Sequence, residues 1–210
     1  MGSSATYKIE IKLAPMPSSN ETDFKRIQLP YRVAVLSDTH VPDRQPRLPV
    51  TLLELIKGEK PDRIFHCGDI STKEVIQQLE AIAPLTAVLG NRDFIFRMDL
   101  PLDVRIVIGG VQVALTHGQG SAWRYFKDKL KYLSTGYDFD RYRRYFDEDF
   151  PDADLVIFGH THTPVDIQIG SKRYFNPGAT YSCYANDNQP RIGLIEFAGA
   201  GKYSTKFISI

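Results

Sequence analysis

Apolar residues along the chain fall into short continuous runs and into helically spaced patterns, and the two kinds alternate from Tyr31 onward. Apolar runs of about four to eight residues between turn residues are typical of buried strands, and apolar residues three and four positions apart are typical of helices. The pattern predicts strands at 31–38, 62–69 and 85–93, and helices at 50–58 and 72–82. Strands that alternate with helices indicate a parallel sheet with helices outside it.

The second half of the chain is richer in strands. Two apolar runs over 104–118 flank Gly109-Gly110, which is a hairpin signal, and residues 165–175 predict another hairpin. Further strands are predicted at 155–158, 191–197 and 203–210. Residues 121–150 are aromatic and charged and are predicted to form a helical insert. The pattern therefore predicts an α/β fold with a run of antiparallel strands in its second half.

The N-terminal residues differ in composition from the rest. The stretch "APMPSSNETD" at 14–23 is typical of a linker, so residues 1–23 are predicted to be an appendage and residues 24–210 one domain. Within the appendage, "YKIEIKL" alternates between polar and apolar residues and predicts a short edge strand. We find no internal repeat.

Composition narrows the class of protein. The chain has 210 residues, 42% of them apolar and 24% charged, with a net charge of +1, as in an ordinary globular domain with no global attraction to nucleic acid or an anionic membrane. Cys67 and Cys183 suggest no disulfide framework, and no apolar run is long enough to span a membrane. We therefore expect a cytoplasmic protein without a membrane partner. Gly2 fits a loose myristoylation pattern, but no basic cluster follows it.

Polar residues of a particular kind follow five of the predicted strands. They stand in "SDTH", "CGD", "GNRD", "THG" and "GHTH", and they are Asp38, His40, Asp69, Asn91, His117, His160 and His162. Open α/β sheets bind ligands at the carboxyl ends of their strands, so we expect these side chains to share one rim. Glycine adjoins them in four of the five motifs, which suits a tight turn or a close backbone approach.

Taken singly, each of these residues has an ordinary interpretation as a cap, a turn residue or a loop histidine. Taken together, all are metal-ligand types, and seven of them suffice for two metal ions that share a ligand. Oxygen and nitrogen ligands without thiolate suit Mn, Fe, Zn, Ni or Mg better than a structural zinc site. Of the five histidines in the chain, His66 is left outside the set.

The ordered series of motifs, with "FNPGA" near the end, resembles the calcineurin-like metallophosphoesterases over roughly residues 31–180. Within that superfamily it looks most like the small bacterial and archaeal phosphodiesterase branch, to which the retromer scaffold subunit is related. The resemblance implies a four-layer αββα sandwich with mixed sheets. It also implies that Asp38, His40 and His162 bind a first metal ion, that Asn91, His117 and His160 bind a second, and that Asp69 bridges both.

The resemblance further implies metal-dependent hydrolysis of phosphodiester bonds, with phosphomonoesters as a second substrate class. A hydroxide held between two divalent ions would attack phosphorus, so no nucleophilic side chain is needed. Manganese is the expected metal, with Fe, Zn, Ni or Mg as alternatives, and the expected substrate is a small phosphodiester or nucleotide-like molecule. The expected catalytic residues are Asp69, Asn91, Arg92 and His117.

Arg92 departs from the pattern, because most of the superfamily has histidine there and the small branch often has cysteine. Arginine cannot donate a proton near neutral pH, but it can hold phosphate oxygens through two hydrogen bonds. We therefore predict that Arg92 binds substrate; the alternative is that it points to solvent. Asp93 is predicted to support a neighbouring ligand from behind rather than to bind metal.

The insert at 121–150 is the second departure, and it leaves two functions open. Its aromatic and basic residues could stack bases and grip phosphates, as in a nuclease. We favour amphipathic helices that pack on the rim or on a partner subunit, which leaves a homo-oligomer open. The residues concerned are Trp123, Arg124, Tyr125, Tyr132, Tyr137, Tyr142, Arg143, Arg144 and Tyr145. A further alternative is a non-catalytic scaffold on the same fold, which would not need the full set of seven ligands.

Overall fold

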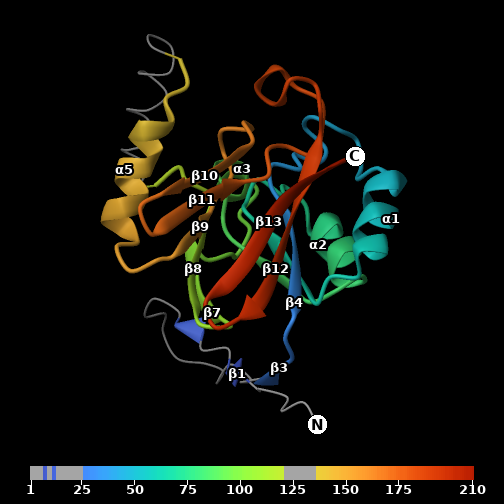
Figure 1. Cartoon of the computed structure of the whole chain (residues 1–210). Helices are drawn as coiled ribbons and strands as arrows, with labels where there is room; N and C mark the ends of the chain where they lie inside the picture. The colour runs from blue at the N-terminus through green and yellow to red at the C-terminus, as the bar shows by residue number, and fades with distance from the viewer. Residues whose placement is uncertain (1–6, 9–10, 13–25, 121–135) are drawn as a thin grey trace.

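Two β-sheets stack face to face in the computed structural model of the chain, with helices on both outer faces (Figure 1). The structure describes residues 7–8, 11–12, 26–120 and 136–210. The sheets hold most of the strands predicted from the apolar runs, and they determine where the strand-end residues meet.

The first sheet carries the strands of the first half of the chain and the last two strands. They are β4 (Tyr31–Leu36), β5 (Arg63–His66), β6 (Leu85–Ala87), β12 (Arg191–Gly199) and β13 (Lys202–Ser209). Their order is β13-β12-β4-β5-β6, in which β4, β5 and β6 are parallel and β12 is antiparallel to both of its neighbours. The carboxyl ends of β4, β5 and β6 therefore lie at the same edge.

The second sheet is mixed. Its strands are β2 (Ile11–Lys12), β7 (Asp103–Ile108), β8 (Val111–Thr116), β9 (Leu155–Ile157), β10 (Val165–Ile169) and β11 (Lys172–Asn176). Their order is β10-β11-β9-β8-β7-β2. The β7–β8 and β10–β11 hairpins are antiparallel, as predicted, and β9 lies parallel to both β8 and β11.

Alternating side chains on the strands produce the layers. Val33 and Val35 of β4 face the second sheet and share a core with its strands, whereas Ala34 and Leu36 face the opposite way, toward α1 (Val50–Glu59) and α2 (Lys73–Glu80). On the far side, α5 (Phe139–Asp149) packs on the outer face of the second sheet. The structure thus confirms the four-layer αββα sandwich with mixed sheets.

Most predicted elements are confirmed, with differences that have physical reasons. The expected run of antiparallel strands is interrupted, because β8, β9 and β11 pair in parallel. Parallel neighbours need a long crossover, and the segment between β8 and β9 supplies it. Three short elements were not predicted, because they are too short for a periodic signal: β3 (Arg26–Ile27), α3 (Asn91–Ile95) and the 3₁₀ helix η1 (Tyr184–Asn186). The strand predicted at 85–93 ends at Ala87, and α3 takes up its last residues.

The two N-terminal expectations have different outcomes. The strand predicted over "YKIEIKL" is confirmed in part, since β2 forms the edge of the second sheet beside β7, but β1 (Tyr7–Lys8) pairs with β3 (Arg26–Ile27) in a separate two-stranded sheet. The division of the chain at residue 23 stays a prediction. In the part of the chain that the structure describes, no helix is long and apolar enough to cross a membrane.

Only part of the insert is described. Residues 121–135, with Trp123, Arg124, Tyr125 and Tyr132, lie outside the described residues. In the remainder, α5 confirms a helix at Phe139–Asp149, which packs Tyr142, Phe146 and Phe150 against the sheet. The buried Tyr142 ring is therefore not available to stack a base. Arg143 forms ion pairs with Asp140 and Asp147 on the same helix.

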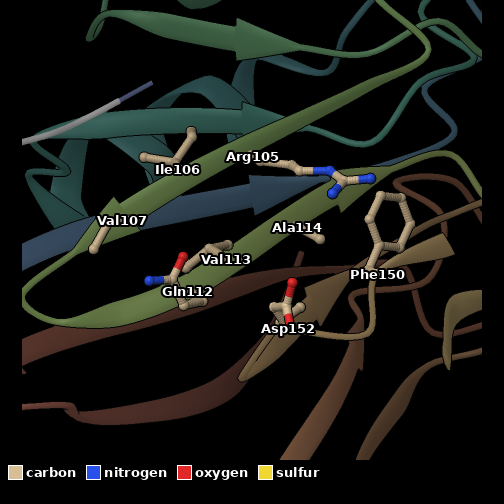
Figure 2. Close-up of a pocket in the computed structure, with 9 residues that line it drawn as sticks. Arg105, Ile106, Val107, Gln112, Val113, Ala114, Phe150 and Asp152 are labelled. Carbon is tan, nitrogen blue, oxygen red and sulfur yellow. The ribbon is translucent and has the colours of Figure 1, made fainter. Parts of the chain in front are cut away.

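A hollow on the outer face of β7 and β8 lies beside the end of α5 (Figure 2). Arg105, Gln112, Phe150 and Asp152 line it. The guanidinium of Arg105 lies 5.1 Å from the centre of the Phe150 ring and donates to the Asp149 carbonyl at 2.9 Å, so this cation already has partners. None of the seven predicted metal ligands lines the hollow.

We expect Phe146→Ala to lower the free energy of unfolding by about 3–5 kcal/mol, the usual range for removing a buried ring. Phe146 is 2% exposed and its ring centre lies 4.7 Å from that of Phe158. Arg144→Ala, on the exposed side of α5, is the matched control and should change stability by no more than about 0.5 kcal/mol. Equal effects in denaturant unfolding would contradict the packing of α5 as the fourth layer.

Candidate metal centre

All seven predicted ligands follow strand ends and meet at one rim between the two sheets. Asp38 and His40 follow β4, Asp69 follows β5, Asn91 begins α3 after β6, His117 follows β8, and His160 and His162 follow β9. The side chains form two groups that share the space between the sheets. The structure therefore places these side chains at one rim, as the sequence predicted.

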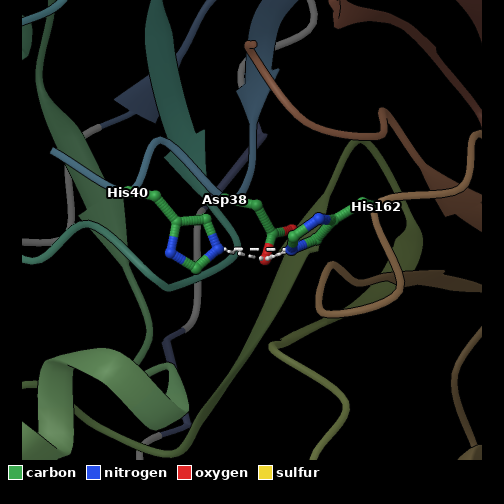
Figure 3. Close-up of side chains that lie close together, drawn as sticks. All are labelled: Asp38, His40 and His162. Carbon is green, nitrogen blue, oxygen red and sulfur yellow. Dashed lines mark hydrogen bonds and ion pairs between the residues drawn. The ribbon is translucent and has the colours of Figure 1, made fainter. Parts of the chain in front are cut away.

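Asp38 is the centre of the first group (Figure 3). Its Oδ2 accepts hydrogen bonds from the Ser37 hydroxyl at 2.5 Å and from the His160 backbone N–H at 3.0 Å. Its Oδ1 is buried and accepts no hydrogen bond from the described residues. This oxygen lies 3.2 Å from Nε2 of His162 and 3.7 Å from Nε2 of His40.

Asp69 lies between the two groups and is fixed in the same way. Its Oδ1 accepts the backbone N–H of Arg92 at 2.8 Å. Its Oδ2 lies 3.4 Å from Nε2 of His40 and 3.6 Å from Nε2 of His117. A single carboxylate oxygen thus faces one histidine of each group, as a bridging ligand requires.

The second group surrounds His117. Nδ1 of His117 lies 2.6 Å from the carbonyl oxygen of Cys67, which can only accept, so Nδ1–H donates to it and Nε2 faces the other ligands. That Nε2 lies 3.3 Å from Oδ1 of Asn91 and 3.2 Å from Nδ1 of His160. Nδ1 of His160 in turn lies 3.1 Å from Oδ1 of Asn91.

The arrangement fits cations. Ligand atoms of Asp38, His40 and His162 lie within 4.8 Å of one another, and so do those of Asp38, Asp69 and His117. These are carboxylate oxygens and imidazole nitrogens that converge on one buried space. Converging acceptors in a buried site are unfavourable unless a positive charge lies between them. Divalent ions that prefer oxygen and nitrogen ligands match this set.

Metal binding needs charged carboxylates and neutral imidazoles, and the pKa shifts of Asp38 and His160 favour these forms. Burial alone raises the pKa of Asp38, but His162 and His40 outweigh it and hold this pKa well below its usual range. Burial, with a further contribution from His117, lowers the pKa of His160 to about 3. For His162, burial lowers the pKa, but the charge of Asp38 more than offsets it and the pKa is raised.

The backbone at the rim is bent into a conformation that most residues avoid. Five of the seven predicted ligands have a positive φ: Asp38 (51°), His40 (47°), Asp69 (57°), His160 (68°) and His162 (58°). Left-handed non-glycine residues cost about 1–3 kcal/mol each and gather at functional sites. Two glycines permit close approach as well, because a Cβ on Gly90 would overlap Asp69 and one on Gly159 would overlap Ser37.

Asp93 supports the rim from behind, as the sequence predicted. It is fully buried, and its carboxylate accepts four backbone N–H groups, from Gly90 and from the three consecutive residues Asp69, Ile70 and Ser71, at 2.7–2.9 Å. It therefore joins the loop after β5 to the start of α3, so that Asp69 and Asn91 keep their spacing.

The sequence matches the calcineurin-like phosphoesterase superfamily domain over residues 31–198, which is most of the chain. The chain belongs to the calcineurin-like phosphoesterase superfamily. Relatives include a probable metallophosphoesterase of Methanothermobacter thermautotrophicus, 29% identical over 147 residues that make up 70% of this chain and 76% of the relative. Membership in this superfamily supports phosphoester hydrolysis as the general activity.

Solved structures share the fold of this superfamily. Vacuolar protein sorting 29 from Cryptosporidium parvum superposes with a TM-score of 0.64 at 20% identity, covering 86% of this chain and 97% of that one. A protein described as a novel archaeal phosphodiesterase superposes with a TM-score of 0.55 at 22% identity, covering 85% of this chain and 99% of that one. These likenesses concern the fold and confirm the predicted architecture.

Arg92 lies at the same rim but is not isolated in solvent. Its Nε lies 3.3 Å from Oδ2 of Asp43, in the loop after β4, and its side chain is 37% exposed. The pair anchors one end of the guanidinium while part of it stays accessible. Its contact with substrate stays a prediction.

Two residues that sequence reasoning missed as supports also hold the rim. Asn176, at the end of β11, donates from Nδ2 to the Gly159 carbonyl and to the Thr161 hydroxyl, both at 3.0 Å. It belongs to "FNPGA" and is a polar residue at a strand end, so the same signal could have found it. Tyr181 reaches His162, and no spacing in the sequence points to that contact.

The described part of the insert reaches the metal centre on the side of the second group. The rings of Tyr142 and His160 are edge to face, with centres 6.2 Å apart, and Tyr137 stacks on Tyr142 at 6.0 Å. Tyr142 of α5 therefore borders the rim, in agreement with the predicted packing of the insert on the rim.

We expect Asp93→Asn to lower stability by about 1–3 kcal/mol, because an amide nitrogen would face backbone N–H groups that lose their acceptor. Metal content should fall as well, since Asp69 and Asn91 lose their fixed spacing. Thermal unfolding and bound-metal analysis measure the two effects, and the exposed Asp99→Asn on the same segment is the control. Wild-type stability and metal content in Asp93→Asn would refute the supporting role.

Proposed function

We propose that this protein hydrolyses phosphodiesters with two divalent metal ions held by the seven rim side chains. One observation carries the proposal. Each central carboxylate has one oxygen fixed by hydrogen-bond donors, while its other oxygen faces imidazole nitrogens. Such a pair of half-fixed carboxylates presents negative charge and lone pairs to the same buried space, as a dinuclear site needs.

The proposed ligand assignment follows the two groups. Asp38, His40 and His162 would hold the first ion; Asn91, His117 and His160 the second; Asp69 would bridge them. The support for the bridge is that Oδ2 of Asp69 lies within 3.6 Å of histidine nitrogens from both groups. When bound, the two ions would lower the pKa of a water and neutralise phosphoryl oxygens. Oxygen and nitrogen ligands without thiolate suit Mn, Fe, Zn, Ni or Mg, and manganese is our proposed metal among them.

Water is the proposed nucleophile because the serine and the cysteine that contact the ligands, Ser37 and Cys67, are poorly suited to attack. The Ser37 hydroxyl donates to Asp38. Cys67 is fully buried, and burial raises the pKa of its thiol well above the usual value, which disfavours a thiolate. In this proposal, hydrolysis depends on how the chain orients the metal ligands and not on a nucleophilic side chain.

Arg92 is proposed to hold a phosphoryl oxygen, with Asp43 orienting its guanidinium. Because arginine stays protonated, it stabilises negative charge but does not protonate a leaving group. The substrates this favours are phosphodiesters whose leaving group departs without that proton. A small phosphodiester or nucleotide-like molecule is the proposed substrate class, and a cytoplasmic location is proposed with it.

A protein-interaction role is the second candidate, because apolar side chains are exposed on α3 and in the loop after it. Phe94 is 73% exposed, Ile95 63% and Leu102 61%. Exposed apolar side chains that gather on one segment are typical of interaction surfaces. A structural neighbour is named vacuolar protein sorting 29, so a scaffold on this fold is a coherent alternative.

Asp69→Asn removes a negative charge shared by two dications while it keeps the shape of the side chain. We expect loss of most bound metal and a fall in hydrolysis by more than about 100-fold, since even an outer-sphere partner is worth about 10–100-fold. An aryl phosphodiester assay with Mn²⁺ and metal analysis measure this, with the exposed Asp152→Asn as control. Near-normal activity in excess metal would exclude the bridging role. No hydrolysis by the wild-type chain under any divalent metal would favour the scaffold.

Arg92→Ala should lower kcat/KM for the phosphodiester by about 10²–10³-fold, the usual effect of losing one charged donor to the transition state. Metal content should stay unchanged, because Arg92 holds Asp69 through its backbone N–H and alanine keeps that group. Asp43→Asn should produce a smaller fall, since it only releases the guanidinium. Unaltered kinetics in Arg92→Ala would show that the side chain serves no substrate.

A further inference from the structure

Tyr181 stands against the first group of candidate ligands. Its hydroxyl lies 3.1 Å from Nδ1 of His162, on the side of the ring opposite to the Nε2 that faces Asp38. Its ring is edge to face with His162, with centres 5.7 Å apart, and with His40 at 5.8 Å. One side chain therefore touches both histidines of the group.

The loop that carries Tyr181 is fixed by its own hydrogen bonds. Asn186 is fully buried and donates from Nδ2 to the carbonyls of Tyr181 at 2.8 Å and Ala179 at 3.2 Å. Its Oδ1 accepts the backbone N–H of Cys183 at 3.0 Å. The tyrosine is thus held in place independently of His162, so it can orient the histidine rather than follow it.

We propose that Tyr181 is a positioning residue that orients the ring of His162 and accepts its Nδ1–H when Nε2 binds the metal ion, and that it thereby sets the affinity of the first metal position. This inference rests on the proposed function. When Nδ1–H of His162 donates to the Tyr181 hydroxyl, Nε2 presents its lone pair to the metal position. In the other tautomer the Tyr181 hydroxyl donates to Nδ1, and Nε2–H donates to Oδ1 of Asp38, 3.2 Å away. The resulting hydrogen bond occupies both ligand atoms and competes with the ion.

The two metal positions differ in how their histidines are held. His117 of the second group donates to a main-chain carbonyl, that of Cys67, which no side-chain substitution removes. In the first group, Nδ1 of His40 is buried and has no hydrogen-bond partner among the described residues. The orientation of the first group therefore depends on Tyr181. Removing the Tyr181 hydroxyl should weaken binding of the ion at the first position and leave binding at the second position unchanged.

Tyr181→Phe tests the hydroxyl alone, because the ring and its edge contacts are kept. The matched control is Tyr184→Phe, which removes a hydroxyl from the same loop at a residue that is 95% exposed. Chelator-stripped protein is titrated with Mn²⁺ in a calorimeter. We expect Tyr181→Phe to weaken one of two binding events by about 10–100-fold and to leave the other within about twofold, with both unchanged in Tyr184→Phe.

The hydrogen bond itself is read by nitrogen NMR of protein labelled with ¹⁵N-histidine and loaded with diamagnetic Zn²⁺. The Nδ1–H of His162 should give a hydrogen-bonded proton signal in the wild type, and Tyr181→Phe should lose that signal. Equal Mn²⁺ affinities in wild type and Tyr181→Phe, or an unchanged Nδ1–H signal, overturn the role of Tyr181 alone. A wild-type chain that binds no Mn²⁺ overturns the proposed function as well, which separates the two failures.

Discussion

The geometry of the centre depends on two aspartates that are each held by one oxygen only. Backbone N–H groups and a serine hydroxyl take Oδ2 of Asp38 and Oδ1 of Asp69, which stops each carboxylate from rotating. The remaining oxygens must then face the histidines. Because the donor to Asp38 is the His160 backbone and the donor to Asp69 is the Arg92 backbone, each carboxylate ties two strand-end loops together. The hydrogen bonds that place the two carboxylates therefore also place the loops that carry the other ligands.

That constraint explains why the sheets are arranged as they are. Parallel pairing puts the ends of β4, β5 and β6 at one edge, and the parallel β8 and β9 do the same in the second sheet. Face-to-face packing through residues such as Val35 and Ile157 brings these edges together. The left-handed backbone at Asp38 and Asp69 is unfavourable locally, and packing of the four layers offsets it. The strain is confined to the rim, where the chain turns sharply to aim side chains inward.

Much of this could be predicted from the sequence, because local signals and the global fold agree. The apolar runs define the strands, and the polar residue after each run, such as Asp69 after "RIFHCG", defines the rim. Contacts between residues distant in sequence could not be predicted: Tyr181 with His162, and Arg92 with Asp43, have no spacing signal. The parallel pairing of β9 was missed because a three-residue strand carries too little pattern to fix its direction.

The central claim is that the seven rim side chains hold two metal ions that share Asp69. The most direct test is a crystal structure of the Mn²⁺-loaded protein with anomalous diffraction data collected at the manganese absorption edge. The account predicts two anomalous peaks per chain, about 3.5–4 Å apart, with a carboxylate oxygen of Asp69 between them. A single peak, or two peaks that Asp69 does not touch, would contradict it.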